Sequence, residues 1–219
     1  MTDEKIAALH FDRLEPSLRE RILETAAEEF SRFGYRVTSM NRVVEKAGIS
    51  KGALFKYFGT KAGLFKRVYT RALDEVRETL RRVREETHGD PFFSRLERIL
   101  TAGLEFTDRR PVYAAIYYRV IYTGDSPHGK EILREIQAES QRFLRSLIED
   151  GIAQGELRRD LDPEKAAFIL QGVLDRFLQA RYLDFMAPDL RPEAGSASGE
   201  DEWIREIVKL FQKGMENHE

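Results

Sequence analysis

The chain has 219 residues, of which 42% are hydrophobic and 34% charged, with a net charge of -2, a composition typical of a globular protein and unlike the disordered and membrane classes. The absence of cysteine excludes disulfides, thiolate metal sites and cysteine nucleophiles, and the four histidines lie too far apart in sequence for a local metal motif, so we expect neither a metal ion nor another cofactor. No segment approaches the ~20 consecutive apolar residues of a membrane span, and the first ten residues lack the basic start and apolar run of a signal peptide, which predicts a cytoplasmic location.

The first predicted helix follows an extension, residues 1–16, to which the sequence assigns no role. Ser17 is a candidate N-cap, and Glu20 three residues later completes a capping box. Apolar residues then recur at helical spacing, and we expect the helix to end at Gly34. These apolar residues are Leu18, Ile22, Leu23, Ala26, Ala27, Phe30 and Phe33.

The second predicted helix begins after Thr38 or Ser39, either of which can act as its N-cap. Its apolar face consists of Met40, Val43, Val44 and Ala47. We expect Gly48 to adopt the left-handed conformation that ends a helix in a tight turn.

The third predicted helix spans residues 51–58, with Ser50 as its N-cap and an end near Gly59. Thr60 can cap a fourth helix, whose apolar residues are Leu64, Phe65, Val68, Leu73, Val76 and Leu80. Further helical patterns follow at about 91–107, 111–122, 127–154, 163–186 and 201–215, and no segment alternates like a strand. We expect residues 187–201, which are rich in proline, glycine and serine, to form a surface loop.

The second and third predicted helices have the dimensions of a helix-turn-helix motif, in which Val43, Val44, Ile49 and Leu54 would pack inward. The outward positions of the third helix carry two cations, a hydroxyl, a phenol and two residues too small to block close approach. These residues are Ser50, Lys51, Gly52, Ala53, Lys56 and Tyr57. Residues 19–71 hold 12 Lys and Arg against 5 Asp and Glu, whereas residues 72–219 hold 22 against 29, as expected for a phosphate-binding module attached to a non-binding body.

Lysines, hydroxyls and capped helix N-termini in this region can form one anion-binding rim. The rim comprises Thr38, Ser39, Lys51, Lys56, Tyr57, Thr60 and Lys61. Contacts of this kind position a protein on the phosphate backbone without selecting a base sequence. Each residue alone is equally compatible with a helix cap, a solvated lysine or a core aromatic, but the arrangement as a whole favours binding to double-stranded DNA.

Residues 22–65 resemble the N-terminal signature of the TetR family of transcriptional regulators. The resemblance covers an aromatic and glycine pattern in the first helix, the start of the second helix, the turn and the third helix. The matching residues are Ala26, Phe30, Gly34, Tyr35, Thr38, Ser39, Ala47, Gly48, Ile49, Ser50, Lys51, Gly52, Phe55, Phe58, Lys61 and Leu64. It implies an all-α fold of about nine helices, a dimer and ligand-controlled DNA binding.

The resemblance also implies roles for single residues. The positions that commonly contact DNA in the family are occupied here by Ser39, Lys51, Gly52, Phe55, Lys56, Tyr57 and Lys61. Asn41 and Ala53 occupy positions at which bases can be read. Phe55 stands where the family usually has tyrosine, which removes one phosphate-binding hydroxyl, and Ala62 and Gly63 replace the usual acidic residues, which leaves the positive rim intact.

The predicted helix at 163–186 carries more apolar residues than one core face requires, which indicates burial against a partner subunit, although a central core helix remains an alternative. The last predicted helix carries a second apolar stripe, and two such helices from each subunit can form a four-helix interface. The expected homodimer residues are Leu170, Val173, Leu174, Phe177, Trp203, Ile207 and Phe211.

Aromatic residues of the inner helices are candidates for an effector pocket, because aromatic walls with phenolic groups suit apolar ligands. The expected pocket residues are Phe106, Tyr113, Tyr117, Tyr118, Phe143 and Phe177. The same residues are equally compatible with simple core packing.

The sequence thus predicts an N-terminal extension at 1–16, a helix-turn-helix DNA-binding domain at 17–62 and a ligand-binding and dimerisation domain at 63–219. The function we expect is that of a repressor that binds a pseudo-palindromic operator as a homodimer and is released by a small apolar or amphipathic effector. A helical protein-interaction adaptor is one alternative, but it leaves the basic rim unexplained. An enzyme is a weaker alternative, because the sequence has no glycine-rich phosphate loop, metal cluster or nucleophile elbow, and we expect no catalytic residues.

Overall fold

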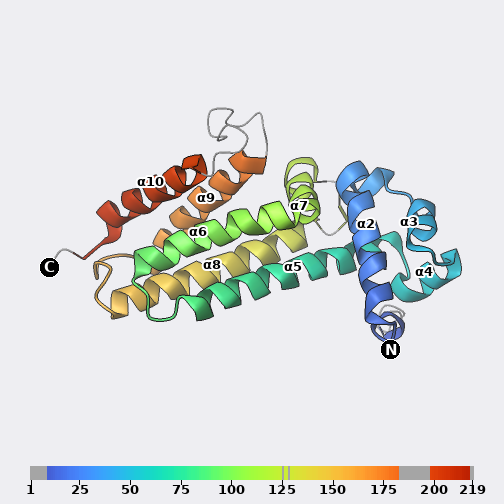
Figure 1. The fold of residues 1–219 in the computed structure, drawn as a ribbon, viewed down its shortest axis with the longest axis horizontal. Helices are drawn as coiled ribbons and strands as arrows, with labels where there is room; N and C mark the ends of the chain where they lie inside the picture. Colours follow the sequence, from blue (N-terminus) through green and yellow to red (C-terminus); the bar gives the residue numbers. More distant parts are fainter. Residues whose placement is uncertain (1–8, 125, 128, 183–197, 218–219) are drawn as a thin grey trace. The chain divides into compact units, whose positions relative to one another are not determined.

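The computed structural model describes residues 9–124, 126–127, 129–182 and 198–217. Within these ranges the regular elements are helices, as predicted, and Figure 1 traces them in chain order. They are α2 (Pro16–Val37), α3 (Met40–Ala47), α4 (Lys51–Phe58), α5 (Lys61–Glu86), α6 (Phe92–Arg109), α7 (Pro111–Thr123), α8 (Gly129–Ala153), α9 (Pro163–Tyr182) and α10 (Ser198–Met215). No described helix has the length and apolar character needed to cross a membrane.

The chain forms two compact units. The N-terminal unit comprises the chain up to Glu75 together with Arg110–Arg134, and the C-terminal unit comprises Val76–Arg109 together with Glu135–Glu219. Helices α5 and α8 each begin in the N-terminal unit and end in the C-terminal unit. Helix α7 therefore belongs to the same unit as the predicted helix-turn-helix.

In the N-terminal unit, α2 packs against both α3 and α7. Apolar side chains of α2, α3, α4 and α5 meet in a core that includes Phe30 and Phe65, whose rings lie edge to face with centroids 4.9 Å apart. Of the side chains expected to pack inward, Val43 and Leu54 are fully buried, and Val44 and Ile49 are half-buried.

The C-terminal unit has its own core, in which α6 packs against α9 and α10. Its buried side chains come from the end of α5 and from α6, α8, α9 and α10, and they include Leu96, Leu147, Ile148 and Leu170. Leu157 and Glu216 form an antiparallel bridge, and this pair is called the strap below. The chain after α10 is thereby tied to the connection between α8 and α9.

Most of the predicted helix ends are confirmed. Ser50 caps α4 by accepting a hydrogen bond from the Ala53 backbone N–H at 3.1 Å, and Thr60 accepts one from the Gly63 N–H at 3.0 Å at the start of α5. Gly48 has the predicted left-handed conformation (φ 66°, ψ 37°), and the chain leaves helical geometry at Gly34, where the first helix was expected to end.

Two predicted boundaries are wrong. Ser17 is not the N-cap of the first helix, because Pro16 already occupies the first helical position, where its fixed φ and missing N–H are tolerated; Glu15 is the N-cap instead. Residues 198–201, expected to belong to a loop, form the first turn of α10. The rest of that expected loop and the end of the helix pattern at 163–186 lie outside the described residues.

Candidate nucleic-acid interface

A buried carboxylate fixes α3 against α2. Glu29 on α2 is only 1% exposed, and its two oxygens accept hydrogen bonds from Arg42 Nε at 2.8 Å and Lys46 Nζ at 2.9 Å. Arg42 and Lys46 are four residues apart on α3, so both project from one face of that helix. This group, called the Glu29 clamp below, sets both the rotation and the axial position of α3.

The clamp also sets the protonation of its carboxyl group. Burial raises the pKa of Glu29, but the hydrogen bonds and charges of Arg42 and Lys46 outweigh burial and hold this pKa below its usual value of 4.5. The Arg42 guanidinium stacks on the Phe33 ring, with 4.4 Å from Cζ to the ring centroid. Glu29, Arg42 and Lys46 were not identified from the sequence, because an acidic residue on one helix and basic residues on another carry no local periodic signal.

The residues expected at the start of the second helix have different environments. Thr38 is 4% exposed, and its hydroxyl donates to the Gly34 carbonyl at 2.7 Å and lies 3.0 Å from the Glu29 carbonyl, so it holds the chain on α2. Ser39 is the N-cap of α3 by backbone conformation, but its side chain makes no capping hydrogen bond. Ser39 is half-buried and Asn41 is exposed.

Helix α4 presents most of the predicted contact residues to solvent. Its buried side chains are Leu54 and Phe58, one turn apart on its inner face. Ser50, Lys51, Gly52, Phe55 and Lys56 are exposed, and Ala53 and Tyr57 are half-buried. These seven residues therefore lie on one short helix or at its N-cap, where five of them are exposed and two are half-buried.

The turn from α4 into α5 is tight. The Thr60 N–H donates to the Phe58 carbonyl at 2.7 Å around Gly59, which has a positive φ of 68°. This fold of the chain brings the Phe58 carbonyl so close to Gly63 that a Cβ there would lie 2.1 Å from its oxygen. The glycine that replaces an acidic residue at position 63 is thus required by this turn.

Lys61 is directed at the protein rather than extended from it. Its Nζ donates to the Arg36 carbonyl at 2.9 Å and lies 5.0 Å from the centroid of the Tyr35 ring. Lys61 therefore joins α5 to the end of α2, while Lys51 and Lys56 are the exposed lysines of α4.

A polar network links α2, α5 and the start of α7 within the N-terminal unit. Arg71 on α5 pairs with Glu20 at 3.1 Å and with Glu75 at 3.2 Å, and Arg110, the N-cap of α7, pairs with Glu75 at 2.6 Å. Burial raises the pKa of the adjacent Tyr113 to about 12, and the Glu75 charge contributes in the same direction. These four charged residues, called the α7 network below, were not identified from the sequence.

The six residues expected to line an effector pocket lie on four helices. In the N-terminal unit, Tyr113 and Tyr118 of α7 are buried and Tyr117 is half-buried, with the Tyr117 and Tyr118 rings 5.2 Å apart. In the C-terminal unit, Phe143 and Phe177 pack against the core and Phe106 is half-buried.

A polar chain inside the C-terminal unit connects α8 and α9. The Gln171 amide donates to the Gln137 side-chain oxygen, and the Gln137 amide donates to Asp175 at 3.3 Å. Gln171 is 5% exposed, and burial raises the pKa of Asp175, although the hydrogen bond from Gln137 lowers it in part. Sequence periodicity did not indicate these polar residues, because Gln171 and Asp175 occur among the apolar positions of α9 and their partner Gln137 lies on a different helix, α8.

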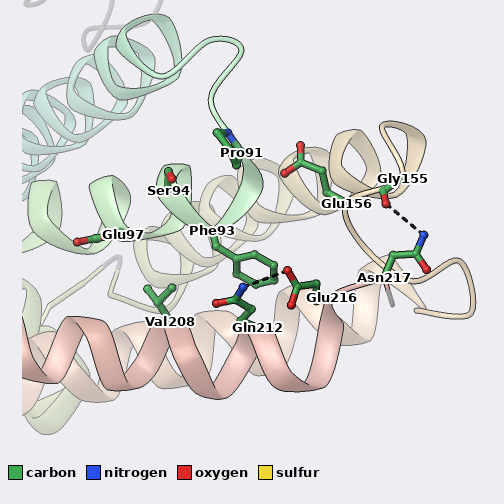
Figure 2. Close-up of a pocket in the computed structure, with 10 residues that line it drawn as sticks. All are labelled: Pro91, Phe93, Ser94, Glu97, Gly155, Glu156, Val208, Gln212, Glu216 and Asn217. Atoms are coloured by element: carbon green, nitrogen blue, oxygen red, sulfur yellow. Dashed lines mark hydrogen bonds between the residues drawn. The ribbon is translucent and has the colours of Figure 1, made fainter. Parts of the chain in front are cut away.

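The C-terminal unit also has a surface pocket of about 450 Å³ beside the strap. Figure 2 shows Phe93 of α6 facing Gln212 of α10 and Glu216 just after that helix, with the Asn217 amide bonded to the Gly155 carbonyl. Three carboxylates line this pocket, those of Glu97, Glu156 and Glu216. None of the six expected effector residues is part of this lining.

The expected dimer residues lie on α9 and α10. Leu170 and Ile207 are buried in the core of their own chain, and Val173, Leu174, Phe177 and Phe211 pack against that core. Trp203 is 41% exposed. The same helices leave three further large apolar side chains exposed, those of Phe168, Ile169 and Leu210, which the sequence pattern did not separate from the core positions.

Two family models match the chain. Residues 22–68 match the model described as bacterial regulatory proteins, tetR family, and residues 91–217 match the model of the tetracyclin repressor-like C-terminal domain. An uncharacterised HTH-type transcriptional regulator of Bacillus subtilis, YhgD, is 30% identical over 69% of this chain and 78% of its own length. The transcriptional regulator AcrR of Shigella flexneri is 26% identical over 80% of this chain and 83% of its own length.

Solved structures agree with these matches. A TetR family transcriptional regulator from Chloroflexus aurantiacus has 25% identity and a TM-score of 0.63, over 94% of this chain and 96% of its own. A second TetR regulator from the same organism, with 21% identity, has the same fold with a TM-score of 0.73, over 92% of this chain and 97% of its own.

Substituting Glu29→Gln is expected to lower the free energy of unfolding by about 1 to 2 kcal/mol at pH 7, because it removes the charge that Arg42 and Lys46 neutralise. Since the folded pKa of Glu29 is depressed, the clamp stabilises the protein above pH 4.5 and loses this effect as the pH falls through the folded pKa. The difference from wild type should therefore shrink below pH 4.5. Thermal unfolding across a pH series measures it, with Glu28→Gln, an exposed neighbour on α2, as control. A difference that does not change with pH would contradict the assignment.

Proposed function

The chain belongs to the TetR family of bacterial transcriptional regulators, and we propose that it is a repressor that binds a pseudo-palindromic operator as a homodimer and leaves it when a small apolar or amphipathic effector binds. Residues 17–62 would serve as the DNA-binding domain, and residues 63–219 as the ligand-binding and dimerisation domain. The adaptor alternative is not favoured, since named relatives are transcriptional regulators and repressors. Regulators of this kind act without catalysis, so no catalytic residue is proposed.

The DNA-binding proposal rests on one observation: α4 presents exposed basic residues to solvent, and its neighbour α3 is held in a fixed position. The Glu29 clamp holds α3 on α2, and α4 packs against α3 with Leu54 buried, while Lys51 and Lys56 stay exposed. A helix of this kind enters the major groove, and its lysines contact phosphates that flank the bases being read. In a dimer the two α4 helices would reach successive major grooves about 34 Å apart.

The double substitution Lys51→Ala/Lys56→Ala is expected to weaken operator binding and to flatten its salt dependence. Four phosphate contacts would be lost per dimer, so the slope of log affinity against log salt should fall by about 4. Gel retardation of fragments that include the DNA flanking the protein's own gene measures both quantities. The matched control is Arg81→Ala/Arg82→Ala, which removes two exposed cations from the other end of α5. If the wild-type protein retards no fragment at low salt, the DNA-binding proposal is wrong.

The dimer proposal is supported by an exposed apolar surface on α9 and α10. Phe168 is 72% exposed, Ile169 58% and Leu210 69%. Trp203 and Leu210 are seven residues apart, so they lie on one face of α10. Four large apolar side chains in contact with water are costly, and burial against the same surface of a second copy relieves that cost for both copies. We infer that Phe168, Ile169, Trp203 and Leu210 form the centre of this interface.

Phe168→Glu/Leu210→Glu is expected to convert the dimer to a monomer. Each introduced carboxylate would be buried without a counter-ion, which should raise the dimer dissociation constant at least ~100-fold. Sedimentation velocity at micromolar concentration measures the change. Ile121→Glu, an equivalent change at an exposed apolar residue of α7, should leave the dimer intact. A variant that sediments like wild type would place the interface elsewhere.

We propose that the effector binds to the aromatic residues expected from the sequence, which are Phe106, Phe143 and Phe177 in the C-terminal unit and Tyr113, Tyr117 and Tyr118 in the N-terminal unit, each set being a candidate by itself. Aromatic walls with a few polar groups suit an apolar ligand, and Gln137, Gln171 and Asp175 supply buried polar groups on α8 and α9. The α7 network offers a route from α7 to α2, because Arg110 and Glu20 are both tied to α5. An effector that favours a second arrangement of α7 would thereby change the setting of α2 and weaken DNA binding.

Compounds that release the operator can be found by screening amphipathic molecules for loss of retardation. Phe106→Ala is expected to weaken that release about tenfold, since an aromatic contact contributes on the order of 1.5 kcal/mol, without changing operator affinity in the absence of the compound. Tyr122→Phe, at a 52% exposed residue of α7, is the control. A release constant equal to that of wild type in Phe106→Ala would remove Phe106 from the site.

A further inference from the structure

The segment before α2 packs against the end of α4. Phe11 is one of the helical residues 9–12 and is only 4% exposed. Its ring meets the Phe58 ring at a centroid distance of 4.9 Å and an angle of 51°. Phe58, also 4% exposed, is the last residue of α4. Neither the composition nor the periodicity of residues 1–16 indicated this contact.

Arg67 on α5 holds the same segment from a second side. Its guanidinium carbon lies 5.3 Å from the centroid of the Phe11 ring, and its NH2 group pairs with Asp12 at 2.9 Å. Arg19 on α2 also contacts the segment, donating to the Asp12 carbonyl at 3.4 Å. The segment is thus attached to α2, α4 and α5, all in the N-terminal unit.

The contact between Phe11 and Phe58 affects the position of α4 because α4 is short. With eight residues α4 is about 12 Å long, and it buries two side chains, Leu54 and Phe58. Leu54 fixes one point of the helix, so the direction of its axis depends on what holds Phe58. Since Phe11 packs directly on Phe58, its removal would leave a space into which the end of α4 can move.

We propose that Phe11 is a positioning residue for operator recognition, which sets the angle at which α4 enters the major groove. Arg67 supports it by holding Phe11 and Asp12 in place. The inference rests on the proposed DNA-binding function and deepens it. Base readout needs side chains placed to within hydrogen-bond tolerance, whereas phosphate attraction tolerates small displacements. A tilt of α4 therefore reduces specific binding more than binding to unrelated DNA.

The test compares Phe11→Ala, Phe11→Leu and wild type on the selected operator and on a non-operator duplex of equal length. Phe11→Ala should reduce operator affinity about tenfold, comparable to the loss of one base contact, and leave non-operator affinity and the salt slope within about twofold. Phe11→Leu, which keeps an apolar side chain against Phe58, should restore most of the operator affinity. Leu9→Ala is the matched control, since Leu9 is also one of the helical residues 9–12 but is 48% exposed.

The outcomes separate the inference from the function on which it rests. If wild type does not select an operator, the DNA-binding proposal itself fails. If wild type selects one and Phe11→Ala binds it equally well, Phe11 has no positioning role. If Phe11→Ala loses operator and non-operator binding in parallel with a lower unfolding temperature, the residue is merely structural and the proposal is overturned. Arg67→Gln, which removes the charge partner of Asp12, should reproduce the selective loss in weaker form.

Discussion

The arrangement of the DNA-binding helices depends on one buried negative charge. A carboxylate as enclosed as that of Glu29 is strongly destabilising unless cations neutralise it, and here the cations come from α3. Because Arg42 and Lys46 must both reach Glu29, α3 has little freedom to rotate or slide on α2. The left-handed Gly48 then directs the chain into α4. The place at which α4 starts, next to α3, therefore depends on satisfying Glu29.

The sequence predicted the helices well because their signals are local. Apolar spacing located α2 to α8, and the capping roles of Ser50 and Thr60 follow from residues one to three positions away. The wrong prediction of Ser17 as N-cap also has a local cause. Two helix-start signals are adjacent in the sequence, and the helix begins at Pro16. The helical pattern also placed the outward residues of α4, of which Ser50, Lys51, Gly52 and Lys56 are exposed while Ala53 and Tyr57 are half-buried.

What the sequence did not predict depends on pairs far apart in the chain. Phe11 and Phe58 are 47 positions apart, and Arg67 and Asp12 are 55 apart. Periodicity describes one helix at a time and carries no information on which face meets which partner. Apolar residues that look alike in sequence also differ in burial. Leu170 is buried in the core of its own chain, while its neighbours Phe168 and Ile169 are exposed. Thr38 and Lys61, expected at the DNA, are engaged with the end of α2.

The polar character of the α7 network has a consequence for regulation. Glu75 is mostly buried, but Arg71 and Arg110 remain partly open to water, and ion pairs with a solvated partner contribute little net stability, so these residues are poorly explained as stabilising elements alone. They differ from apolar packing in their directionality, because an apolar contact tolerates sliding whereas a guanidinium and a carboxylate pair in few geometries. A helix held by such pairs changes position by exchanging partners, which gives discrete arrangements rather than a continuum. Since α5 continues from this network into the C-terminal unit, a change of partner at Glu75 would couple the proposed effector binding to the setting of α2.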